Sequence, residues 1–126
     1  MPIVSASLPA ELLGEVDRAI DGGGYRGRSE FMRAAIRDHL QQRHVPDKGH
    51  VHGSVTLVYP HGKEAKVSEV RHAFHDVVLS LMHTHCEADT CMDVLLVGGP
   101  VARVLALQQT LERMRDVTRS RLAIMA

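Results

Sequence analysis

A short alternating segment, residues 3–8, precedes two amphipathic helices and has no partner strand within its own unit. Its side chains alternate between an apolar face and a mixed face, namely Val4, Ala6 and Leu8 against Ile3, Ser5 and Ser7. This alternation is the period of a β-strand. A lone strand leaves its backbone hydrogen-bonding groups unpaired. We therefore expect it to pair, antiparallel about a twofold axis, with the same strand of a second chain.

Two helices complete this N-terminal unit. Pro9 is suited to the start of the first helix, and Gly22, Gly23 and Gly24 end it. Ser29 is the predicted N-cap of the second helix. Each helix has an apolar face of helical period, formed by Leu12, Leu13, Val16, Ala19 and Ile20 in the first and by Met32, Ala35, Ile36 and Leu40 in the second. The pattern predicts an obligate strand-helix-helix dimer.

Beyond a polar linker, the apolar periodicity predicts a second domain. We expect a strand over 51–59, a helix over 64–76, strands over 77–85 and 91–97 joined by a five-residue turn, a helix over 100–117 and a strand over 118–124. The order β-α-β-β-α-β is typical of a ferredoxin-like sandwich. The predicted class is therefore α+β, with domains at 1–43 and 51–126 and a linker at 44–50.

The composition indicates where the protein is located and which classes of partner it binds. No apolar run approaches the roughly 18 residues that span a bilayer, and the N-terminus lacks the pattern of a secretory signal. We expect a cytoplasmic protein with no membrane partner and with reduced cysteines. Net charge is zero, but residues 25–48 carry six basic and three acidic side chains, a local charge of +3. Scarce aromatic residues argue against a stacking platform for single-stranded nucleic acid.

Histidine is abundant, with nine in the chain and seven of them between residues 50 and 85. His83 and His85 lie two apart on a predicted strand, so both project from one face. The turn after them places Cys91 opposite His85, and cross-strand partners share a face. Two imidazoles and a thiolate suit nickel, copper, zinc or cobalt.

The fourth ligand is open at this point. His72 and His75 lie three apart on the preceding helix, and either residue, from this chain or a neighbour, is able to complete the set. We interpret His61 and His39 as ordinary surface or hydrogen-bonded histidines. Cys86 points to the opposite face from His85 and is not expected to bind the metal.

The N-terminal unit also has the features of a DNA-binding module. A two-stranded antiparallel ribbon fits the major groove, and its outward side chains would be Ile3, Ser5 and Ser7. The start of the second helix, at Arg28 and Ser29, offers N–H groups and a positive dipole end to a phosphate. The alternative is a small dimerisation module without a DNA partner.

These residues resemble the ribbon-helix-helix repressor family over residues 4–40. The pattern is carried by Leu8, Leu12, Gly24-Tyr25, Arg28-Ser29-Glu30, Arg33 and Ile36. The whole chain resembles the nickel-responsive regulator (NikR) family, in which such a module is fused to an ACT-type, ferredoxin-like domain.

The resemblance implies a planar Ni²⁺ site of His83, His85, Cys91 and His72, with His72 donated by another subunit of a homotetramer, a dimer of dimers. It places His75 and Asp76 near that site, in a supporting or secondary-metal role. Glu30 matches a residue that holds a second cation in some members, but Ala34 stands where those members have a carboxylate. Ile3 replaces a polar or charged base-contacting residue of other members, so the operator sequence is expected to differ.

The function implied is a nickel-dependent, DNA-binding transcriptional repressor of nickel-uptake genes, not an enzyme. The main alternative is a ribbon-helix-helix regulator with a structural zinc site or with copper or cobalt as effector. An antitoxin would need a disordered or helical tail, and an amino-acid-sensing ACT domain would leave the metal-ligand pattern unexplained. A metallohydrolase would need an open site with a general base, for which only Glu87 and Asp89 lie near.

Overall fold

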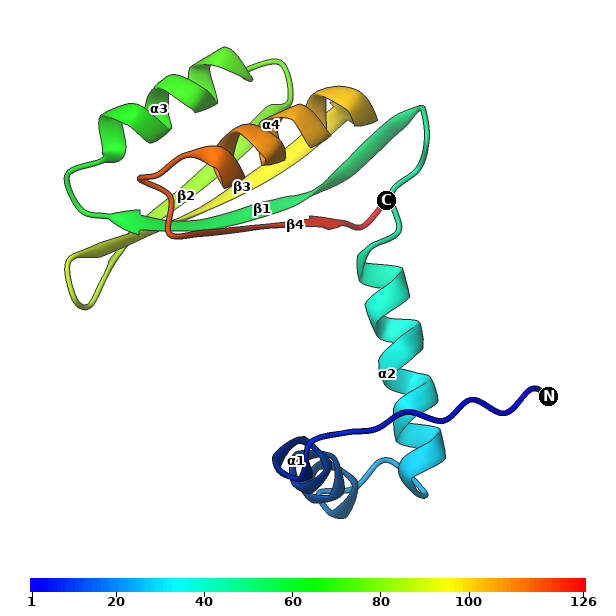
Figure 1. Ribbon diagram of the computed structural model, residues 1–126. Helices are drawn as coiled ribbons and strands as arrows, with labels where there is room; N and C mark the ends of the chain where they lie inside the picture. The colour runs from blue at the N-terminus through cyan, green and yellow to red at the C-terminus, as the bar shows by residue number, and fades with distance from the viewer. The chain divides into compact units, whose positions relative to one another are not determined.

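The computed structural model describes all 126 residues, and the chain divides into two compact units, Met1–Arg43 and His44–Ala126 (Figure 1). The first unit contains helices α1 (Ala10–Asp21) and α2 (Arg28–Gln42). Residues 1–9 form no helix and no paired strand in the single chain (Figure 1). The intermolecular ribbon that we expect from residues 3–8 therefore stays a prediction.

The start of α2 differs from the sequence-based expectation. The helix begins at Arg28, and Gly27 rather than Ser29 is its N-cap. The first helical hydrogen bond runs from the Phe31 N–H to the Gly27 carbonyl, at 3.1 Å. Glu30 then reaches back, and its carboxylate accepts a 2.7 Å hydrogen bond from the Arg26 N–H. The side-chain cap expected from Ser29 is therefore absent, and the only side-chain-to-backbone hydrogen bond at this turn is the one that the Glu30 carboxylate accepts from the Arg26 N–H.

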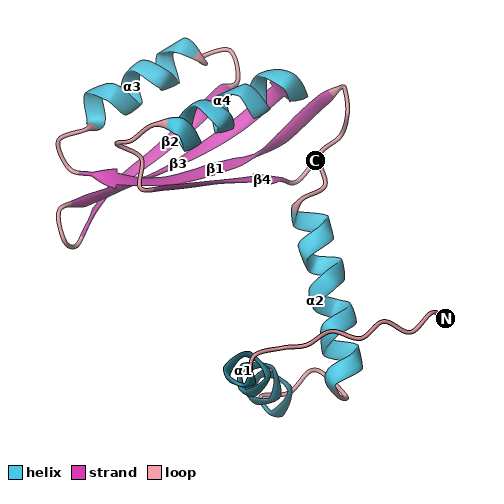
Figure 2. Cartoon of the chain, in the orientation of Figure 1, coloured by secondary structure: helices cyan, strands magenta, loops and turns pink.

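The second unit has the predicted element order. Strand β1 (His50–Pro60) is followed by α3 (Glu64–Ala73), β2 (Val78–Cys86), β3 (Thr90–Pro100), α4 (Val101–Arg113) and β4 (Arg119–Ile124). The strands form one antiparallel sheet in the order β2-β3-β1-β4. Figure 2 shows both helices on the same face of this sheet. The α+β, ferredoxin-like fold class is thus confirmed.

Element bounds depart from the expected ones by a few residues. Helix α3 ends at Ala73 rather than Asp76, because Phe74 leaves the helical conformation and closes the last turn through its N–H. Helix α4 ends at Arg113 rather than Val117, where Met114 becomes extended. The β2–β3 turn has three residues, 87–89, rather than five, since Cys86 and Thr90 already pair as strand residues.

The core lies between the helix-covered sheet face and the two helices. Alternate residues of β1 and β3 point into it, and α4 adds an apolar stripe. Its fully buried side chains include Val55, Leu57, Val67, Leu95, Val104, Leu107 and Leu111. None of the helices is both long and apolar enough to cross a membrane.

Candidate metal centre and nucleic-acid interface

The three predicted ligands of the hairpin share one face of the sheet. In the β2–β3 register, His85 pairs with Cys91 and His83 pairs with Asp93, which confirms the predicted cross-strand position of Cys91. This is the helix-covered face, but at edge strand β2 both histidines remain exposed, whereas Cys91 is buried. The His83 and His85 ring centroids lie 5.9 Å apart. Cys86 pairs with Thr90 and is exposed.

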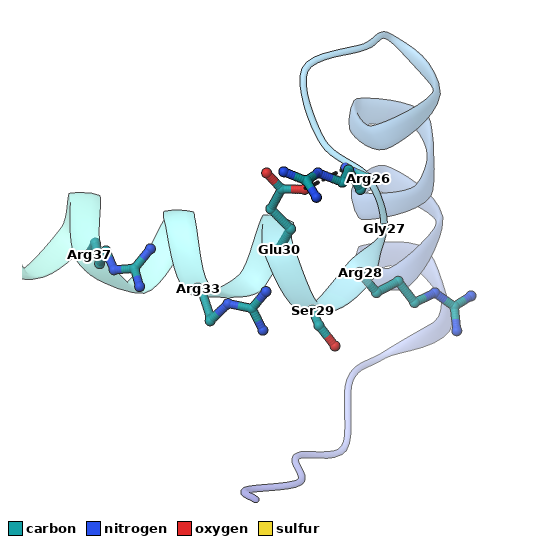
Figure 3. A pocket seen from close by; sticks show the side chains of 7 residues that line it. All are labelled: Arg26, Gly27, Arg28, Ser29, Glu30, Arg33 and Arg37. Carbon is teal, nitrogen blue, oxygen red and sulfur yellow. Dashed lines mark hydrogen bonds and ion pairs between the residues drawn. The ribbon is translucent and has the colours of Figure 1, made fainter. Parts of the chain in front are cut away.

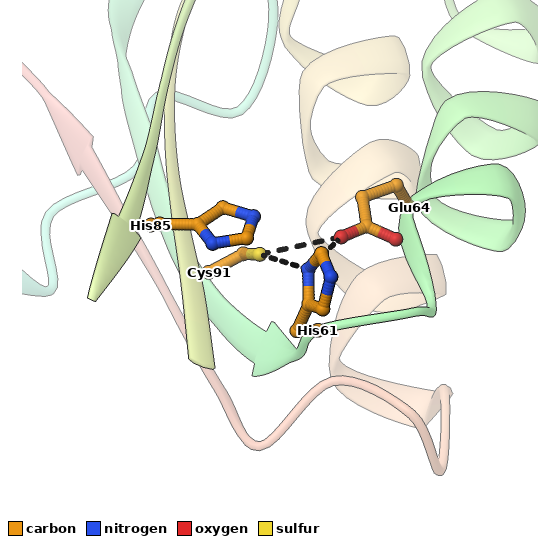
Figure 4. A group of neighbouring side chains, drawn as sticks. All are labelled: His61, Glu64, His85 and Cys91. Atoms are coloured by element: carbon orange, nitrogen blue, oxygen red, sulfur yellow. Dashed lines mark hydrogen bonds and ion pairs between the residues drawn. The ribbon is translucent and has the colours of Figure 1, made fainter. Parts of the chain in front are cut away.

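Two further residues complete a compact group with His85 and Cys91. His61 follows the end of β1, and Glu64 is the first residue of α3. The ligand atoms of His61, Glu64, His85 and Cys91 all lie within 4.8 Å of one another. We call these four residues the hairpin cluster. Figure 4 shows their side chains pointing toward one another.

Sequence reasoning missed this group by treating His61 as an ordinary surface histidine. The pairing of β1 with β3, which brings His61 to the hairpin, was not among the predicted features. That register places Tyr59 opposite Cys91 and Pro60 opposite Thr90. The residue after Pro60 must then lie beside the β2–β3 turn, and the His61 N–H donates to the Asp89 carbonyl at 2.7 Å.

Local backbone geometry fixes the positions of His61 and Glu64. Gly62 has φ +98°, in the left-handed region that favours glycine, so the chain turns sharply between β1 and α3. The Gly62 N–H donates to Glu64 Oε2 at 2.9 Å, and Glu64 Oε1 lies 2.7 Å from His61 Nδ1. Hydrogen bonds from the N–H groups of Glu64 itself and of Gly62 hold the pKa of the Glu64 carboxyl down at about 2.

Cys91 contacts the same carboxylate. Its thiol donates to Glu64 Oε1 at 3.4 Å, and Sγ lies 3.7 Å from His61 Nδ1. Burial raises the pKa of the Cys91 thiol, and the hydrogen bond to Glu64 raises it further. A bound cation reverses this preference, because a coordinated thiol is deprotonated.

His83 is oriented by a buried carboxylate. Its Nδ1 donates to Asp93 Oδ1 at 2.6 Å, and Asp93 is only 1% exposed. The Tyr59 hydroxyl donates to the same oxygen at 3.0 Å. A hydrogen bond from Nδ1–H to a carboxylate leaves the lone pair on Nε2, as in most metal-binding histidines. Asp93 therefore presents His83 as a ligand through Nε2.

The two candidate histidines of α3 have a similar arrangement through backbone carbonyls. His72 Nδ1 lies 2.7 Å from the Ser68 carbonyl oxygen, and His75 Nδ1 lies 3.1 Å from that of His72. Both side chains are exposed. In each, Nε2 is the nitrogen left for a ligand outside the chain. Neither residue belongs to the hairpin cluster.

Asp76 has a structural partner. Arg103 in α4 binds it with two hydrogen bonds, of 3.0 and 2.7 Å, and also donates to the Ala73 carbonyl. The same guanidinium lies over the Phe74 ring, 4.4 Å from its centroid. Asp76 thus fixes the end of α3 beside α4, next to the segment that carries His72 and His75.

The donor types of this region fit nickel. Imidazole nitrogens and a thiolate suit divalent late first-row metals, and a planar set of such donors is typical of Ni(II) and Cu(II). Three donors lie on adjacent strands of one chain, namely His83, His85 and Cys91. The hydrogen bond to Asp93 orients His83 so that its Nε2 is able to bind a metal. A planar four-donor set requires one more residue than this trio provides.

In the N-terminal unit, a pocket surrounds the start of α2. It is lined by Arg26, Gly27, Arg28, Ser29, Glu30, Arg33 and Arg37 (Figure 3). The helix has no side-chain cap, so its first N–H groups are available to an anion. Ser29, Arg33 and Arg37 are spaced four apart and therefore follow one side of the helix.

Arg28 is engaged within the unit. Its Nε and Nη2 donate to the two carboxylate oxygens of Asp17 in α1, at 3.0 and 2.9 Å. This bidentate pair ties the two helices together, so the expected phosphate contact of Arg28 competes with a structural one. Glu30, which matches a cation-holding residue of some family members, interacts with the backbone N–H of Arg26 and, at 3.7 Å, with its guanidinium.

Comparison with known proteins covers both units. Residues 52–125 match the NikR C-terminal nickel-binding domain, and residues 3–43 match the ribbon-helix-helix protein family of the CopG type. Proteins that carry the provisional name of nickel-responsive regulator are similar over nearly the whole chain. One from Dictyoglomus turgidum is 34% identical across 94% of this chain and 90% of its own length. One from Methanocaldococcus jannaschii is 32% identical across 99% and 92%.

A solved structure supports the fold of part of the chain. An uncharacterized protein of Thermotoga maritima superposes with a TM-score of 0.56 and 17% identity, over 62% of this chain and all of its own. At that identity only the fold is shared. The matches of both units, together with relatives that span both, establish that the chain belongs to the nickel-responsive regulator family, as a ribbon-helix-helix regulator with a nickel-binding C-terminal domain.

Proposed function

We propose that this chain is a nickel-dependent repressor that binds operator DNA as a homotetramer, a dimer of dimers. Nickel would be held by His83, His85 and Cys91 of one subunit and by His72 of a neighbouring subunit. The observation that carries this proposal is the orientation of the histidines. The Nδ1 atoms of His83 and His72 are bonded to Asp93 and to the Ser68 carbonyl, which leaves Nε2 of each as the nitrogen able to bind a metal.

A planar set built on His83, His85 and Cys91 leaves one position open, and the exposed His72 of a neighbouring subunit would fill it. His85 and Cys91 are cross-strand neighbours with His83 beside them, and His72 lies on the exposed surface of α3. A metal ion that joins the trio to a neighbouring His72 cross-links two subunits through α3. The ion supplies a planar coordination preference, and the chain supplies oriented donors.

The N-terminal unit supports a DNA partner. Its strand segment would pair with that of a second chain and present Ile3, Ser5 and Ser7 to base edges in the major groove. The uncapped start of α2 would receive a phosphate, and Arg33 and Arg37 extend the positive surface along the helix. Neither arginine forms an ion pair within the chain.

Repression would follow from linkage between the two sites. Nickel that cross-links subunits restricts the orientations of the DNA-binding dimers, and DNA bound at two half-sites favours the same restricted state. Each ligand therefore raises the affinity of the other. A coupling of about 1–3 kcal/mol, roughly 5–150-fold, is typical for such systems. The regulated genes would be those of nickel uptake. The protein would act in the cytoplasm.

The metal half of the proposal is tested with reduced, metal-free protein. Ni(II) is added while electronic absorption is followed, with Cys91→Ala as the comparison. We expect a thiolate-to-nickel charge-transfer band that saturates at one metal per chain and is absent from the variant. Saturation without such a band, or the same spectrum from Cys91→Ala, would rule out the planar site.

The DNA half requires no knowledge of the operator. Duplexes selected from a random pool with nickel-loaded protein are titrated with and without nickel, using wild type, His72→Ala and His75→Ala. The two variants are matched, because both histidines are exposed on α3 three residues apart. We expect nickel to tighten binding in wild type and in His75→Ala but not in His72→Ala. A nickel response retained by His72→Ala would refute the cross-subunit ligand.

A further inference from the structure

The hairpin cluster holds a complete four-donor set within one chain. It offers one atom each from two imidazoles, one carboxylate and one thiol, all within 4.8 Å of one another. Within this set, His61 Nδ1 lies 2.7 Å from Glu64 Oε1, and Cys91 Sγ lies 3.4 Å from that same oxygen. The rings of His61 and His85 lie 4.2 Å apart between centroids. Figure 4 shows that the four side chains come from four different segments.

This convergence is built into the backbone. The β1–β3 register brings the end of β1 beside Cys91, and the β2–β3 register brings His85 beside it. The turn at Gly62 then places His61 and Glu64 on either side, with Glu64 held by the Gly62 N–H. The donors therefore approach one another without any contribution from a second subunit.

The donor set matches zinc chemistry. Cysteine, histidine and carboxylate are the ligands of Zn²⁺ in proteins, where four-coordinate tetrahedral geometry predominates. The four residues do not lie along one sheet face, since His61 follows β1 and Glu64 begins α3, while His85 and Cys91 lie on the β2–β3 hairpin. The combination of a thiol and two imidazoles disfavours Mg²⁺ and Ca²⁺, which select oxygen ligands.

We propose that His61, Glu64, His85 and Cys91 form a tetrahedral zinc site within one chain, and that this site and the nickel site exclude each other. The exclusion rests on the proposed function, because both sites use His85 and Cys91. Zinc recruits His61 and Glu64 of the same chain, whereas nickel recruits His83 and a neighbouring His72. On zinc binding, the Cys91 thiol proton passes to water and the thiolate becomes a ligand.

The two sites would have opposite consequences for the assembly. Zinc in the hairpin cluster leaves His72 uncoordinated, so it forms no cross-link through α3. Nickel, with its planar preference, uses the cross-subunit donor. The protein thus distinguishes zinc from nickel by coordination geometry, although both metals accept similar ligands. Zinc-loaded protein remains in the state with low DNA affinity.

The test uses full-length reduced protein with Co(II) as a spectroscopic probe for zinc. Tetrahedral cobalt with a thiolate ligand gives intense ligand-field bands, and zinc competition against a chromophoric chelator gives the affinity. We expect a tetrahedral cobalt spectrum from wild type and its loss from His61→Ala/Glu64→Gln. The zinc affinity of that double variant should fall more than the roughly 10–100-fold that loss of an outer hydrogen-bond partner causes.

The matched control is His72→Ala/His83→Ala, which removes two residues of the nickel site and leaves the hairpin cluster intact. We expect this variant to keep the tetrahedral cobalt spectrum and the wild-type zinc affinity. This arm decides the question even if His61→Ala/Glu64→Gln misfolds. Loss of the tetrahedral spectrum in the control, or unchanged zinc affinity in His61→Ala/Glu64→Gln, would overturn the proposal.

Exclusion is measured separately. Wild type given both metals should bind a total of one ion per chain, and added zinc should remove the nickel charge-transfer band in proportion to its uptake. Two ions per chain would contradict exclusion. The proposed function fails by a different result, the absence of a nickel band in wild type without zinc, so the two failures are distinguishable.

Discussion

None of residues 1–43 is buried, whereas residues 44–126 enclose a core in which Leu57, Leu95 and Leu107 are completely inaccessible to solvent. In the first unit, apolar residues such as Ile36 and Leu40 remain 58% and 63% exposed although they lie on one amphipathic helix face. An apolar face of this kind indicates an interface, because burial of apolar surface is the main driving force of folding.

The difference shows two forms of dependence on a partner chain. In the proposed assembly, a second copy completes the core of the N-terminal unit. The C-terminal unit completes its core alone, but its proposed nickel site requires a donor from a neighbour. On this proposal, assembly stabilises the first unit and regulates the second.

A substitution in the core of the C-terminal unit should cause the greatest loss of stability. Leu107 is fully buried in α4, so Leu107→Ala removes apolar contacts and leaves a cavity. We expect the free energy of unfolding of this unit to fall by about 2–5 kcal/mol. Urea denaturation monitored by circular dichroism measures the change. The control is Leu105→Ala, because Leu105 lies on the same helix but is only partly buried; equal losses would contradict the core described here.

Sequence patterns predicted most of the fold because period and burial coincide. Alternation in β1 and β3 and the helical stripe of α4 follow the core face. The His85–Cys91 pair was also predictable, since the hairpin is local. His61 and Glu64 were not predicted as ligands, because their position depends on the β1–β3 pairing between segments about 30 residues apart. The Asp17–Arg28 pair was missed for a similar reason, since it joins two helices across a glycine-rich turn.

A second prediction tests whether the buried carboxylate of Asp93 supports the proposed nickel site. Asp93 is buried and holds His83 Nδ1, so Asp93→Asn removes the charge that fixes this tautomer. We expect nickel affinity to fall by about 10–100-fold, the usual range for such a partner. Competition with a nickel chelator measures it.

The matched variant for this test is Tyr59→Phe. It removes only the hydroxyl that donates to Asp93 and leaves the carboxylate beside His83. Its effect on nickel affinity should be smaller than that of Asp93→Asn. Equal affinity in wild type and Asp93→Asn would show that the carboxylate serves packing alone.

A third prediction addresses the incomplete core of the N-terminal unit. Ile36 is half-exposed in one chain, so Ile36→Ala should be almost neutral unless a second copy covers it. With dimerisation, we expect a loss of about 1–2 kcal/mol per subunit, a part of the roughly 1.5–3 kcal/mol gained by full burial of such a side chain. Denaturation at several protein concentrations tests this. The unfolding midpoint of a dimer depends on protein concentration, and Ile36→Ala should lower that midpoint at every concentration. Arg37→Ala, at the neighbouring position, should leave the midpoint unchanged, and equal behaviour of the two variants would argue against the dimer.

The ion pair between Asp17 and Arg28, which joins the two helices of the N-terminal unit, should make only a small contribution to stability. The hydrogen bonds from Arg28 hold the pKa of the Asp17 carboxyl below its ordinary value. A depressed pKa in the folded state means that the pair stabilises the unit above the unfolded pKa, about 3.9 for Asp, and that this stabilisation is lost as the pH falls through the lower folded value. Because both side chains are well exposed, we expect a small effect that weakens with salt.

The pKa of Asp17 is measured from its carboxyl-carbon chemical shift as a function of pH. Acid unfolding of Asp17→Asn should lack the loss of stability that protonation of Asp17 causes, whereas acid unfolding of Asp21→Asn should retain it. An Asp17 that titrates at its ordinary pKa would mean that Arg28 is not held within the unit and is available to a phosphate, as the sequence first suggested.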